Sequence, residues 1–302
     1  MRFAAELWID RPDVTFVPAH ALPLILPGKA VATVHDLGYR FFPEAHPAYE
    51  RFYLDLTTRT TSRRASRILA DSLATKRDLV AQYGVSADKI DVVYPGVEGL
   101  SRASTAQIAA ARAKYGLPDS YFLFLGTLQP RKNIQRLIEA FGRYCTENAD
   151  RDIGLVLAGK RGWLIEDVLR QALEALPAAQ RERVIFTGYV DNDEIAPLYS
   201  GALALVFPSL YEGFGFPVLE AMLCGTPVIC SNTSSLPELA GDAAVLVDPL
   251  RVDAIAAGMA QLAGDSALRE SLVQKGHQQA AQFTWDRAAQ LTLQALEAAA
   301  QQ

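Results

Sequence analysis

Short apolar runs alternate along the chain with longer segments of mixed polarity, and this alternation constrains the fold more than any other feature. The segments between the runs, such as 47–65 and 72–83, have the length and pattern of helices. Strands that are separated by helices pair in parallel, so the alternation predicts βα units around a parallel sheet. In the first third of the chain the predicted strands are Val14–Val17, Ala30–Val34, Ile68–Ala70 and Ile90–Tyr94.

A second alternating series begins after residues 95–118, a stretch whose Gly, Ser and Pro content predicts a linker around one short helix. Six strands with helical crossovers would make a complete doubly wound domain. Residues 251–302 predict helices almost throughout, and about 150 residues per domain gives two domains for a chain of 302. The predicted strands of this series are Tyr121–Leu125, Ile153–Leu157, Val184–Phe186, Ala202–Phe207, Pro227–Cys230 and Ala244–Val247.

The first series is shorter than the second. A doubly wound domain places its earliest strands in the middle of the sheet, so a domain of about four strands that starts at Met1 would leave an open edge. Three interpretations follow: a partner covers the edge, the domain is smaller, or the chain is a fragment of a longer protein.

Composition excludes several classes of function. The net charge of −5, from 29 basic and 34 acidic residues, is unlike the basic excess of nucleic-acid-binding proteins. Three cysteines are too few for a disulfide framework, so we expect buried thiols and a cytoplasmic location. The sequence shows neither a signal peptide nor a run of about 18 apolar residues, so no membrane-spanning helix is expected.

A glycine-containing loop follows the predicted strand that ends at Phe207. It contains Gly213 and Gly215, and a helix is expected to start near Pro217. Strand, loop and helix N-terminus together form a site for an anionic ligand, because the first N–H groups of a helix are unpaired.

Two carboxylates belong to the same segment, Glu212 in the loop and Glu220 about one turn into the helix. Carboxylates accept hydrogen bonds from a diol, so this pair suits the recognition of hydroxyl groups. The alternative for Glu220 is a favourable charge near a helix N-terminus.

Two further segments place polar residues after predicted strands. Arg131 and Lys132 lie between a strand and a helix, where two cations suit a diphosphate; the alternative is a solvated turn. His35 follows the strand Ala30–Val34 and would point into a cleft, although it could instead be a structural histidine bonded to backbone.

Other patterns lead elsewhere. Asp191-Asn-Asp193 fits an Asp-x-Asp metal motif, but Asp191 with Glu194 predicts a capping box instead. No phosphate-binding P-loop is present, and the dinucleotide fingerprint that Gly213 begins has Val218 at its third position, which disfavours a nicotinamide dehydrogenase. A basic cluster at the end of the helix 47–65 predicts either favourable charge at a helix C-terminus or a surface for an acidic membrane or a phosphate-bearing acceptor. This cluster comprises Arg59, Arg63, Arg64 and Arg67.

Taken together and in this order, these segments resemble the family-four, or group-one, retaining glycosyltransferases. The resemblance implies an α/β fold of the GT-B type: two Rossmann-like parallel-sheet domains with a cleft between them, the first incomplete. It implies a partial acceptor-side domain at 1–100, a nucleotide-sugar domain at 101–285 and a helix at 286–302 that crosses back to the first domain. The matching segments are Val34-His35-Asp36, Pro130-Arg131-Lys132-Asn133, Phe186-Thr-Gly188, Glu212 to Glu220, Gly225-Thr-Pro-Val228, Glu238-Leu-Ala-Gly-Asp242 and Phe283-Thr-Trp285.

The resemblance also implies roles for single residues. Arg131 and Lys132 would hold the diphosphate of a nucleotide-sugar donor, and Glu220 would bind its ribose. Glu212 and His35 would contact the donor sugar. Backbone groups would complete the site, those of Gly188, Tyr189 and Val190 beside the base, and those of the donor-binding loop Gly213, Phe214, Gly215 and Phe216 near the donor sugar.

The implied chemistry needs neither a metal nor an enzymic base. Cations and a helix N-terminus would stabilise the departing nucleoside diphosphate. The acceptor, a glycan or a lipid-linked sugar, would attack from the face that the leaving group departs, with retention of configuration. The residues around Glu212 and at Ser234-Ser-Leu-Pro237 are most like those of mannosyltransferases, so GDP-mannose is the first expected donor.

The chain departs from the family pattern in two places. Thr127 stands where many members have Arg, so Arg131 as second cation is an inference. The opening strand and Gly-rich loop of the usual first domain have no counterpart, which is roughly a third of that domain. The alternatives are therefore a catalytically impaired nucleotide-sugar-binding subunit, a truncated enzyme, or another GT-B enzyme such as an epimerase or phosphorylase.

Overall fold

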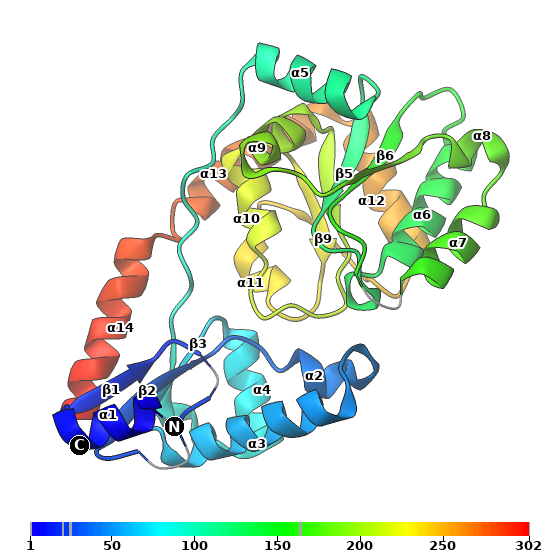
Figure 1. The fold of residues 1–302 in the computed structure, drawn as a ribbon. Helices are drawn as coiled ribbons and strands as arrows, with labels where there is room; N and C mark the ends of the chain where they lie inside the picture. Colours follow the sequence, from blue (N-terminus) through cyan, green and yellow to red (C-terminus); the bar gives the residue numbers. More distant parts are fainter. Residues whose placement is uncertain (1, 20, 24–25, 163–164, 302) are drawn as a thin grey trace. The chain divides into compact units, whose positions relative to one another are not determined.

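The computed structural model describes residues 2–19, 21–23, 26–162 and 165–301, which divide into two compact units. Unit 1 comprises Met1–Gly96, Glu212–Phe214 and Phe283–Gln302, and unit 2 comprises Val97–Tyr211 and Gly215–Gln282. Each unit holds one parallel sheet with helices against it, which confirms the predicted α/β class (Figure 1).

The sheet of unit 1 runs in the order β1-β2-β3-β4, with every pair parallel. Its strands lie where the sequence predicts them, and β1 has no strand on its outer side among the residues that the structure describes. The strands are β1 (Val14–Val17), β2 (Lys29–Val34), β3 (Arg67–Ala70) and β4 (Ile90–Val92).

Both faces of this sheet are buried. Successive side chains of a strand point to opposite sides, so each strand contributes to two core clusters. Ala30 and Ala32 face one core cluster with Ile68, whereas Val31 faces another, which includes Ala295. Helix α14 (Trp285–Ala300) supplies Ala295 and packs against β1, β2 and β3. The other helices of this unit are α1 (Arg2–Asp10), α2 (Gly38–Phe41), α3 (Ala48–Arg64) and α4 (Leu73–Tyr83), with 3₁₀ turns at Pro43–Ala45 and Ala87–Lys89.

The sheet of unit 2 has the order β10-β9-β8-β5-β6-β7, and all pairs are parallel. The strand order reverses between β5 and β8, and open α/β sheets bind ligands outside the carboxyl ends of the strands at such a switch point. All six predicted strands are present: β5 (Tyr121–Leu125), β6 (Gly154–Ala158), β7 (Val184–Gly188), β8 (Ala204–Phe207), β9 (Val228–Ser231) and β10 (Val245–Val247).

Helices cover both faces of this sheet. Helices α6, α7 and α12 lie on one face, α9, α10 and α13 lie on the other, and α5 packs against α9 (Figure 1). Phe124 of β5 stacks on Phe207 of β8 with ring centroids 5.7 Å apart, so the switch point rests on a packed aromatic layer. The helices are α5 (Thr105–Tyr115), α6 (Ile134–Glu147), α7 (Glu166–Glu174), α8 (Ala178–Arg181), α9 (Asn192–Gly201), α10 (Phe216–Leu223), α11 (Leu236–Ala240), α12 (Val252–Gly264) and α13 (Ser266–Ala280).

Two local predictions are wrong. The capping box at Asp191 is incomplete: Asp191 makes no side-chain cap bond, while the Glu194 carboxylate accepts hydrogen bonds from Lys114 and Tyr115 of α5 as well as from the Asp191 backbone. Arg67 does not belong to the end of α3: it opens β3 and pairs with Asp91 of the neighbouring strand.

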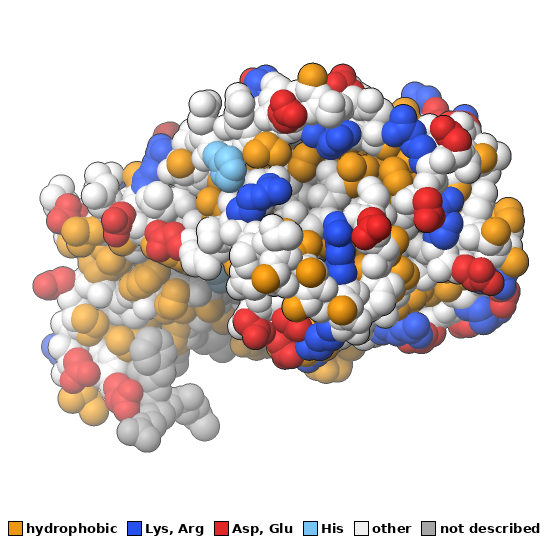
Figure 2. All heavy atoms as spheres, turned by 90° about the horizontal axis from the view of Figure 1, so that it is seen from above, with side chains coloured by type: hydrophobic (Ala, Val, Ile, Leu, Met, Phe, Trp, Pro, Cys, Tyr) orange, Lys and Arg blue, Asp and Glu red, His pale blue; other side chains and the backbone are white. Residues whose placement is uncertain are grey.

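The cysteines agree with the expectation of buried thiols. Cys145, Cys224 and Cys230 are buried and unpaired. None of the described helices is both long and apolar enough to cross a bilayer. Lys and Arg side chains are interspersed with Asp and Glu on the described part of the face in Figure 2, and form no continuous basic surface there.

Candidate functional site

The turn after β5 is fastened to the loop after β8. Pro130–Lys132 form a 3₁₀ turn, and the Arg131 guanidinium donates to the carbonyl of Tyr211 at 2.6 Å. The Leu210 N–H donates in return to the carbonyl of Arg131 at 2.9 Å. The two segments that the sequence singled out therefore meet at the switch point of unit 2.

The buried side chain of Asn133 stabilises this junction. It has a φ of +61° and is 3% exposed, and its amide donates to the carbonyls of Pro208 and Pro249 at 3.0 and 2.7 Å. Lys132 follows the same turn, with its Nζ 4.9 Å from the centroid of the Phe207 ring. Two cations are thus placed at the base of the glycine-containing loop.

Helix α10 begins at Phe216 because Gly215 permits a sharp entry. Gly215 has a φ of +135°, and a Cβ there would lie 2.7 Å from the Leu236 side chain. Pro217 occupies the first turn, where its missing N–H costs no hydrogen bond. In the first turn of α10, Pro217 carries no N–H and the Val218 N–H donates to the carbonyl of Gly215 at 3.0 Å.

Glu220 has a partner that the sequence did not reveal. The Tyr199 hydroxyl, from α9, donates to Glu220 Oε2 at 2.9 Å. Burial raises the pKa of the Glu220 carboxyl, and the bond from Tyr199 opposes that rise. One carboxylate oxygen is held in place, as recognition of a diol requires.

The backbones of the residues at the carboxyl ends of β5, β6 and β7 lie in direct contact. A Cβ on Gly159 would lie 2.1 Å from the carbonyl oxygen of Gly126, and Gly159 N–H donates to the carbonyl of Gly188 at 2.9 Å. Beyond Gly188, Tyr189 is 59% exposed and Val190 is buried. The Nζ of Lys160 lies 4.6 Å from the Tyr189 ring centroid, a contact that sequence reasoning missed.

His35 lies in unit 1, at the end of β2, with an acceptor beside each ring nitrogen. Its Nδ1 is 2.8 Å from Asp71 Oδ2, and its Nε2 is 3.3 Å from the carbonyl oxygen of Pro18. Only the imidazolium can donate to both. The hydrogen bond with Asp71 raises the pKa of His35 above its ordinary value, against the opposing effect of burial.

Asp71 could have been found from the sequence. It directly follows β3, and β3 is the parallel neighbour of β2, whose end carries His35. The carboxyl ends of parallel strands lie on one edge of a sheet, so a carboxylate there is expected to reach the histidine.

Glu212–Phe214 pack with unit 1 although both flanking segments belong to unit 2. A Cβ on Gly213 would lie 2.3 Å from the carbonyl oxygen of His35, so only glycine fits there. The Thr75 hydroxyl is shared between that carbonyl, at 3.2 Å, and the carbonyl of Gly213, at 3.4 Å. Glu212 itself is 7% exposed.

An aromatic cluster anchors the same segment. Phe214 lies 6.4 Å from Tyr94 and 6.0 Å from Phe283 between ring centroids, and those two rings are 5.4 Å apart. Unit 1 therefore brings together His35, Glu212, Gly213 and Phe214.

Within unit 2, Arg131 and Lys132 follow β5, and Gly215, Phe216 and Glu220 follow the adjacent strand β8. The unit does not bring Gly188, Tyr189 and Val190 beside them. These three follow β7, an edge strand two positions from β5, or about 10 Å along the same edge at roughly 4.8 Å per strand.

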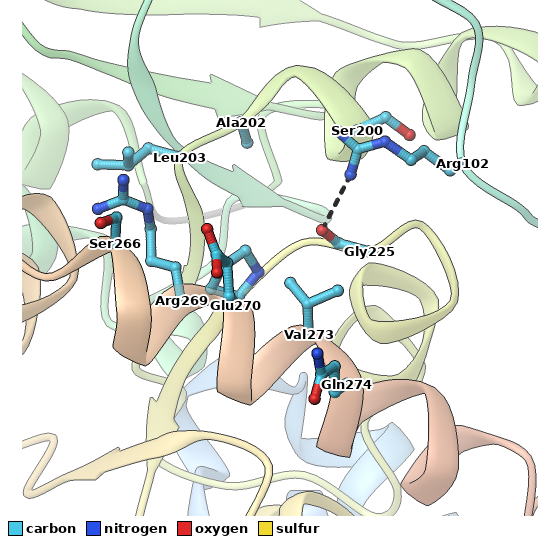
Figure 3. A pocket seen from close by; sticks show the side chains of 11 residues that line it. Arg102, Ser200, Ala202, Leu203, Gly225, Ser266, Arg269, Glu270, Val273 and Gln274 are labelled. Carbon is cyan, nitrogen blue, oxygen red and sulfur yellow. Dashed lines mark hydrogen bonds between the residues drawn. The ribbon is translucent and has the colours of Figure 1, made fainter.

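A hollow of about 570 Å³ lies elsewhere in unit 2. Leu203 and Pro227 line it just before β8 and β9, so it lies at the amino edge of the sheet, opposite the Arg131 turn. Figure 3 shows Arg102 and Arg269 on opposite sides with Glu270 between them. No residue predicted to bind the donor lines this hollow.

In the described part of the chain, no three His, Cys, Asp or Glu residues gather as metal ligands would. Asp191 and Asp193, which carry the Asp-x-Asp pattern, lie at the N-terminus of α9.

Known proteins resemble the chain along nearly all of its length. Residues 2–98 match the model described as "Glycosyltransferase Family 4". An O-antigen chain mannosyltransferase B of Escherichia coli is 36% identical over 269 residues, which are 88% of this chain and 70% of that protein. A serotype-specific mannosyltransferase WbdA of Escherichia coli is 32% identical over 89% of this chain, which spans only 33% of that longer protein.

Solved structures share the fold. A structure of Anabaena HepE in complex with UDP and glucose matches 90% of this chain and 71% of that one, with a TM-score of 0.74 and 22% identity. A structure of WaaG, a glycosyltransferase involved in lipopolysaccharide biosynthesis, matches 96% and 79%, with a TM-score of 0.72 and 18% identity. Because residues 107–279 also match the model described as "Glycosyl transferases group 1", the chain belongs to the group 1 glycosyl transferases and has the GT-B fold.

Proposed function

We propose that the chain transfers a hexose from a nucleoside-diphosphate sugar to a glycan or a lipid-linked acceptor, with mannose from GDP-mannose as the first donor to test. The observation that carries the proposal is the junction at the switch point of unit 2. There the Arg131 turn follows β5, and α10, which carries Glu220, follows the adjacent strand β8. Arg131 donates to Tyr211 in the loop before α10, and Tyr199 of α9 donates to Glu220. The mannosyltransferase relatives support the choice of sugar.

Each element of this junction has a role in donor binding. Arg131, Lys132 and the positive end of the α10 dipole offer positive charge to a diphosphate. Glu220, with one oxygen held by Tyr199, accepts hydrogen bonds from the ribose diol. Gly188, Tyr189 and Val190 accommodate the base, and the exposed Tyr189 ring provides a stacking surface.

Unit 1 contributes the groups for the donor sugar. His35 acts as an imidazolium that Asp71 orients. Its Nε2 donates to a sugar hydroxyl after the hydrogen bond from Nε2 to the Pro18 carbonyl breaks. Glu212 accepts from other hydroxyls of the same sugar. Gly213 and Thr75 tie its loop to the His35 backbone, so the two groups are positioned together.

The reaction keeps the anomeric configuration. The bond between the sugar C1 and the diphosphate oxygen breaks, and its electron pair leaves with the nucleoside diphosphate. The acceptor oxygen bonds to C1 from the same face, and its proton passes to the departing phosphate oxygen. Arg131, Lys132 and α10 stabilise the charge that develops there, which in comparable sites is worth about 2.7–4 kcal/mol per donor. No metal takes part in this scheme.

The three buried, unpaired cysteines support a reducing compartment, so we place the reaction in the cytoplasm.

A panel of GDP, UDP and ADP tests the donor site by thermal unfolding. At 100 times its Kd a ligand stabilises by about 2.7 kcal/mol, or roughly 5–10 °C for a domain of this size. We expect the largest shift with GDP, and a loss of that shift in Glu220→Ala. Glu174→Gln, at an exposed end of α7 in the same unit, is the matched control. No shift with any nucleotide, or an equal shift in Glu220→Ala, would overturn the site assignment.

Transfer is measured separately, with radiolabelled GDP-mannose and a mannose-containing acceptor in the presence of EDTA. We expect a product whose anomeric configuration, read by NMR, equals that of the donor. Nucleotide binding without either transfer or donor hydrolysis would instead support a binding subunit without turnover.

A further inference from the structure

Helix α3 has its polarity reversed. Three threonines, Thr57, Thr58 and Thr61, are the buried residues of this helix. Its outward side chains are large and apolar: Tyr49, Phe52, Tyr53 and Leu56 are 78%, 71%, 55% and 43% exposed. A helix that packs only on its own domain normally shows the opposite pattern.

The exposed side chains form one continuous stripe. Tyr49, Phe52, Tyr53 and Leu56 follow the i, i+3, i+4, i+7 spacing of one helix face, and Arg59 and Arg63 continue it at i+10 and i+14. Arg64 lies beside Arg63 at the helix end, where Lys89 also donates to the carbonyl of Ser62 at 2.8 Å. We name these seven residues, Tyr49, Phe52, Tyr53, Leu56, Arg59, Arg63 and Arg64, the outer face of α3.

The buried threonines lock the helix in this rotation. The Thr58 hydroxyl accepts from Tyr39 Oη at 2.9 Å, and Thr61 Oγ1 accepts from the N–H of Leu22 at 3.3 Å. The Thr57 hydroxyl donates back to the carbonyl of Tyr53 at 2.9 Å. Turning the apolar stripe inward would leave these buried polar groups without partners.

We propose that the outer face of α3 docks on the surface of a bilayer that contains anionic lipids. Tyr and Phe side chains are suited to the boundary between headgroups and acyl chains, where a helix with an apolar face lies in the plane of the membrane. The cations at one end match lipid phosphates.

Charge favours a bilayer over a neutral partner. The chain carries a net charge of −5, so an anionic membrane repels most of its surface. A basic end on the aromatic face of α3 overcomes this repulsion locally and fixes one orientation. Arg59 contributes less than Arg63 and Arg64, because it already pairs with Asp55 at 2.7 Å.

Co-sedimentation with vesicles tests the proposal on the full chain. We expect binding to vesicles of phosphatidylglycerol and phosphatidylcholine, and at least tenfold weaker binding to phosphatidylcholine alone. The double variant Tyr49→Ser, Phe52→Ser should lose at least tenfold in binding to the mixed vesicles. Arg63→Glu, Arg64→Glu should abolish the preference for phosphatidylglycerol.

The matched control is Leu293→Ser, which removes a side chain of unit 1 that is 55% exposed on α14, away from α3. It should bind the mixed vesicles as the unsubstituted chain does. All variants should keep the nucleoside-diphosphate thermal shift of the unsubstituted chain, which separates this proposal from the donor-site assignment and shows that the variants fold.

Three results would overturn the proposal. The first is equal binding of the unsubstituted chain and the Tyr49→Ser, Phe52→Ser variant, and the second is binding to neither vesicle. The third is a concentration-dependent dimer in gel filtration that this variant abolishes, which would assign the outer face of α3 to a second copy of the chain.

Discussion

Helices α3 and α6 both pack on a parallel sheet, yet they bury opposite kinds of residue. Helix α6 buries Leu137, Ile138 and Phe141 and turns residues such as Gln135 and Arg143 outward. Helix α3 buries threonines and exposes Tyr49 and Phe52. The apolar face of a helix packs against another apolar surface, so its direction indicates where that surface lies. For α6 that surface is the core of unit 2, and for α3 it lies outside the chain.

The sharpest way to break this comparison is to truncate one phenylalanine from each helix. Phe141→Ala removes a fully buried ring from α6 and should reduce the free energy of unfolding by about 3–5 kcal/mol. Phe52→Ala removes a ring that is 71% exposed and should change it by no more than about 0.5 kcal/mol. Urea unfolding measures both values. A loss of several kcal/mol in Phe52→Ala would mean that the outer face of α3 is covered within the chain.

A second prediction concerns the buried polar groups of unit 2. Tyr199→Phe removes the hydroxyl that donates to Glu220, a hydrogen bond to a charged group worth about 1.5–3 kcal/mol. We expect roughly tenfold or greater loss of nucleoside-diphosphate affinity in calorimetry at pH 7. The pKa of Glu220 should also rise further, because the lost bond opposes its rise, so affinity should fall at a higher pH on acidification.

The control for this variant is Tyr144→Phe. Tyr144 is fully buried in α6, and its hydroxyl makes no hydrogen bond within the described residues. Equal affinity losses in Tyr199→Phe and Tyr144→Phe would show that the effect comes from packing rather than from Glu220.

The buried threonines of α3 should contribute less than the buried ring of α6. Thr58→Val keeps the side-chain volume and removes the acceptor for Tyr39, at a cost of about 1 kcal/mol in unfolding free energy. Thr60→Val, whose hydroxyl donates to the carbonyl of Leu56 on the same helix, should cost close to nothing by the same urea titration. Neither variant should change vesicle binding, since both leave the outer face of α3 intact.

The smallest expected effect is at His35, because half of its side chain is exposed and solvent screens the pair. Asp71 and Asp36 both raise the pKa of His35, Asp71 the more, so Asp71→Asn should lower it. The pair stabilises the fold fully below the unfolded pKa of about 6.5, and this stabilisation is lost as the pH rises through the higher folded pKa. Transfer activity should follow the imidazolium and decline at a lower pH in Asp71→Asn.

Proton NMR of the imidazole resonances reads the His35 pKa directly, with His35→Gln to assign its signal. Glu50→Gln is the matched control, because Glu50 lies beside His46, at 3.5 Å, and it should leave the His35 signal unchanged. An unchanged His35 pKa in Asp71→Asn would contradict the imidazolium assignment.

Much of the molecule was predictable because local pattern carries it. Strands such as Tyr121–Leu125 are fully apolar and flanked by Gly or Pro, so their buried position follows from the sequence. The segment from Phe207 to Glu220 predicted the end of a strand, a turn and the start of a helix, because Gly215 and Pro217 are typical of a helix start. The capping box at Asp191 is incomplete, because the Asp191 side chain makes no cap bond. The bonds from Lys114 and Tyr115 to Glu194 join residues 80 and 79 positions apart, so no local pattern could reveal them.

The sequence alone determined the two parallel sheets, the strand ends followed by Arg131 and His35, the helix that carries Glu220, and the family, because these depend on alternation and on motifs a few residues long. Tertiary structure alone decided that Tyr199 meets Glu220, that Glu212 packs with unit 1, and that α3 turns its aromatic residues outward. Each of these depends on groups that are far apart in the chain and close in space. The spacing of apolar residues in a sequence does not indicate whether a threonine will have a buried hydrogen-bond partner. In α3 the hydrogen bonds of the buried threonines decide which face of the helix is exposed.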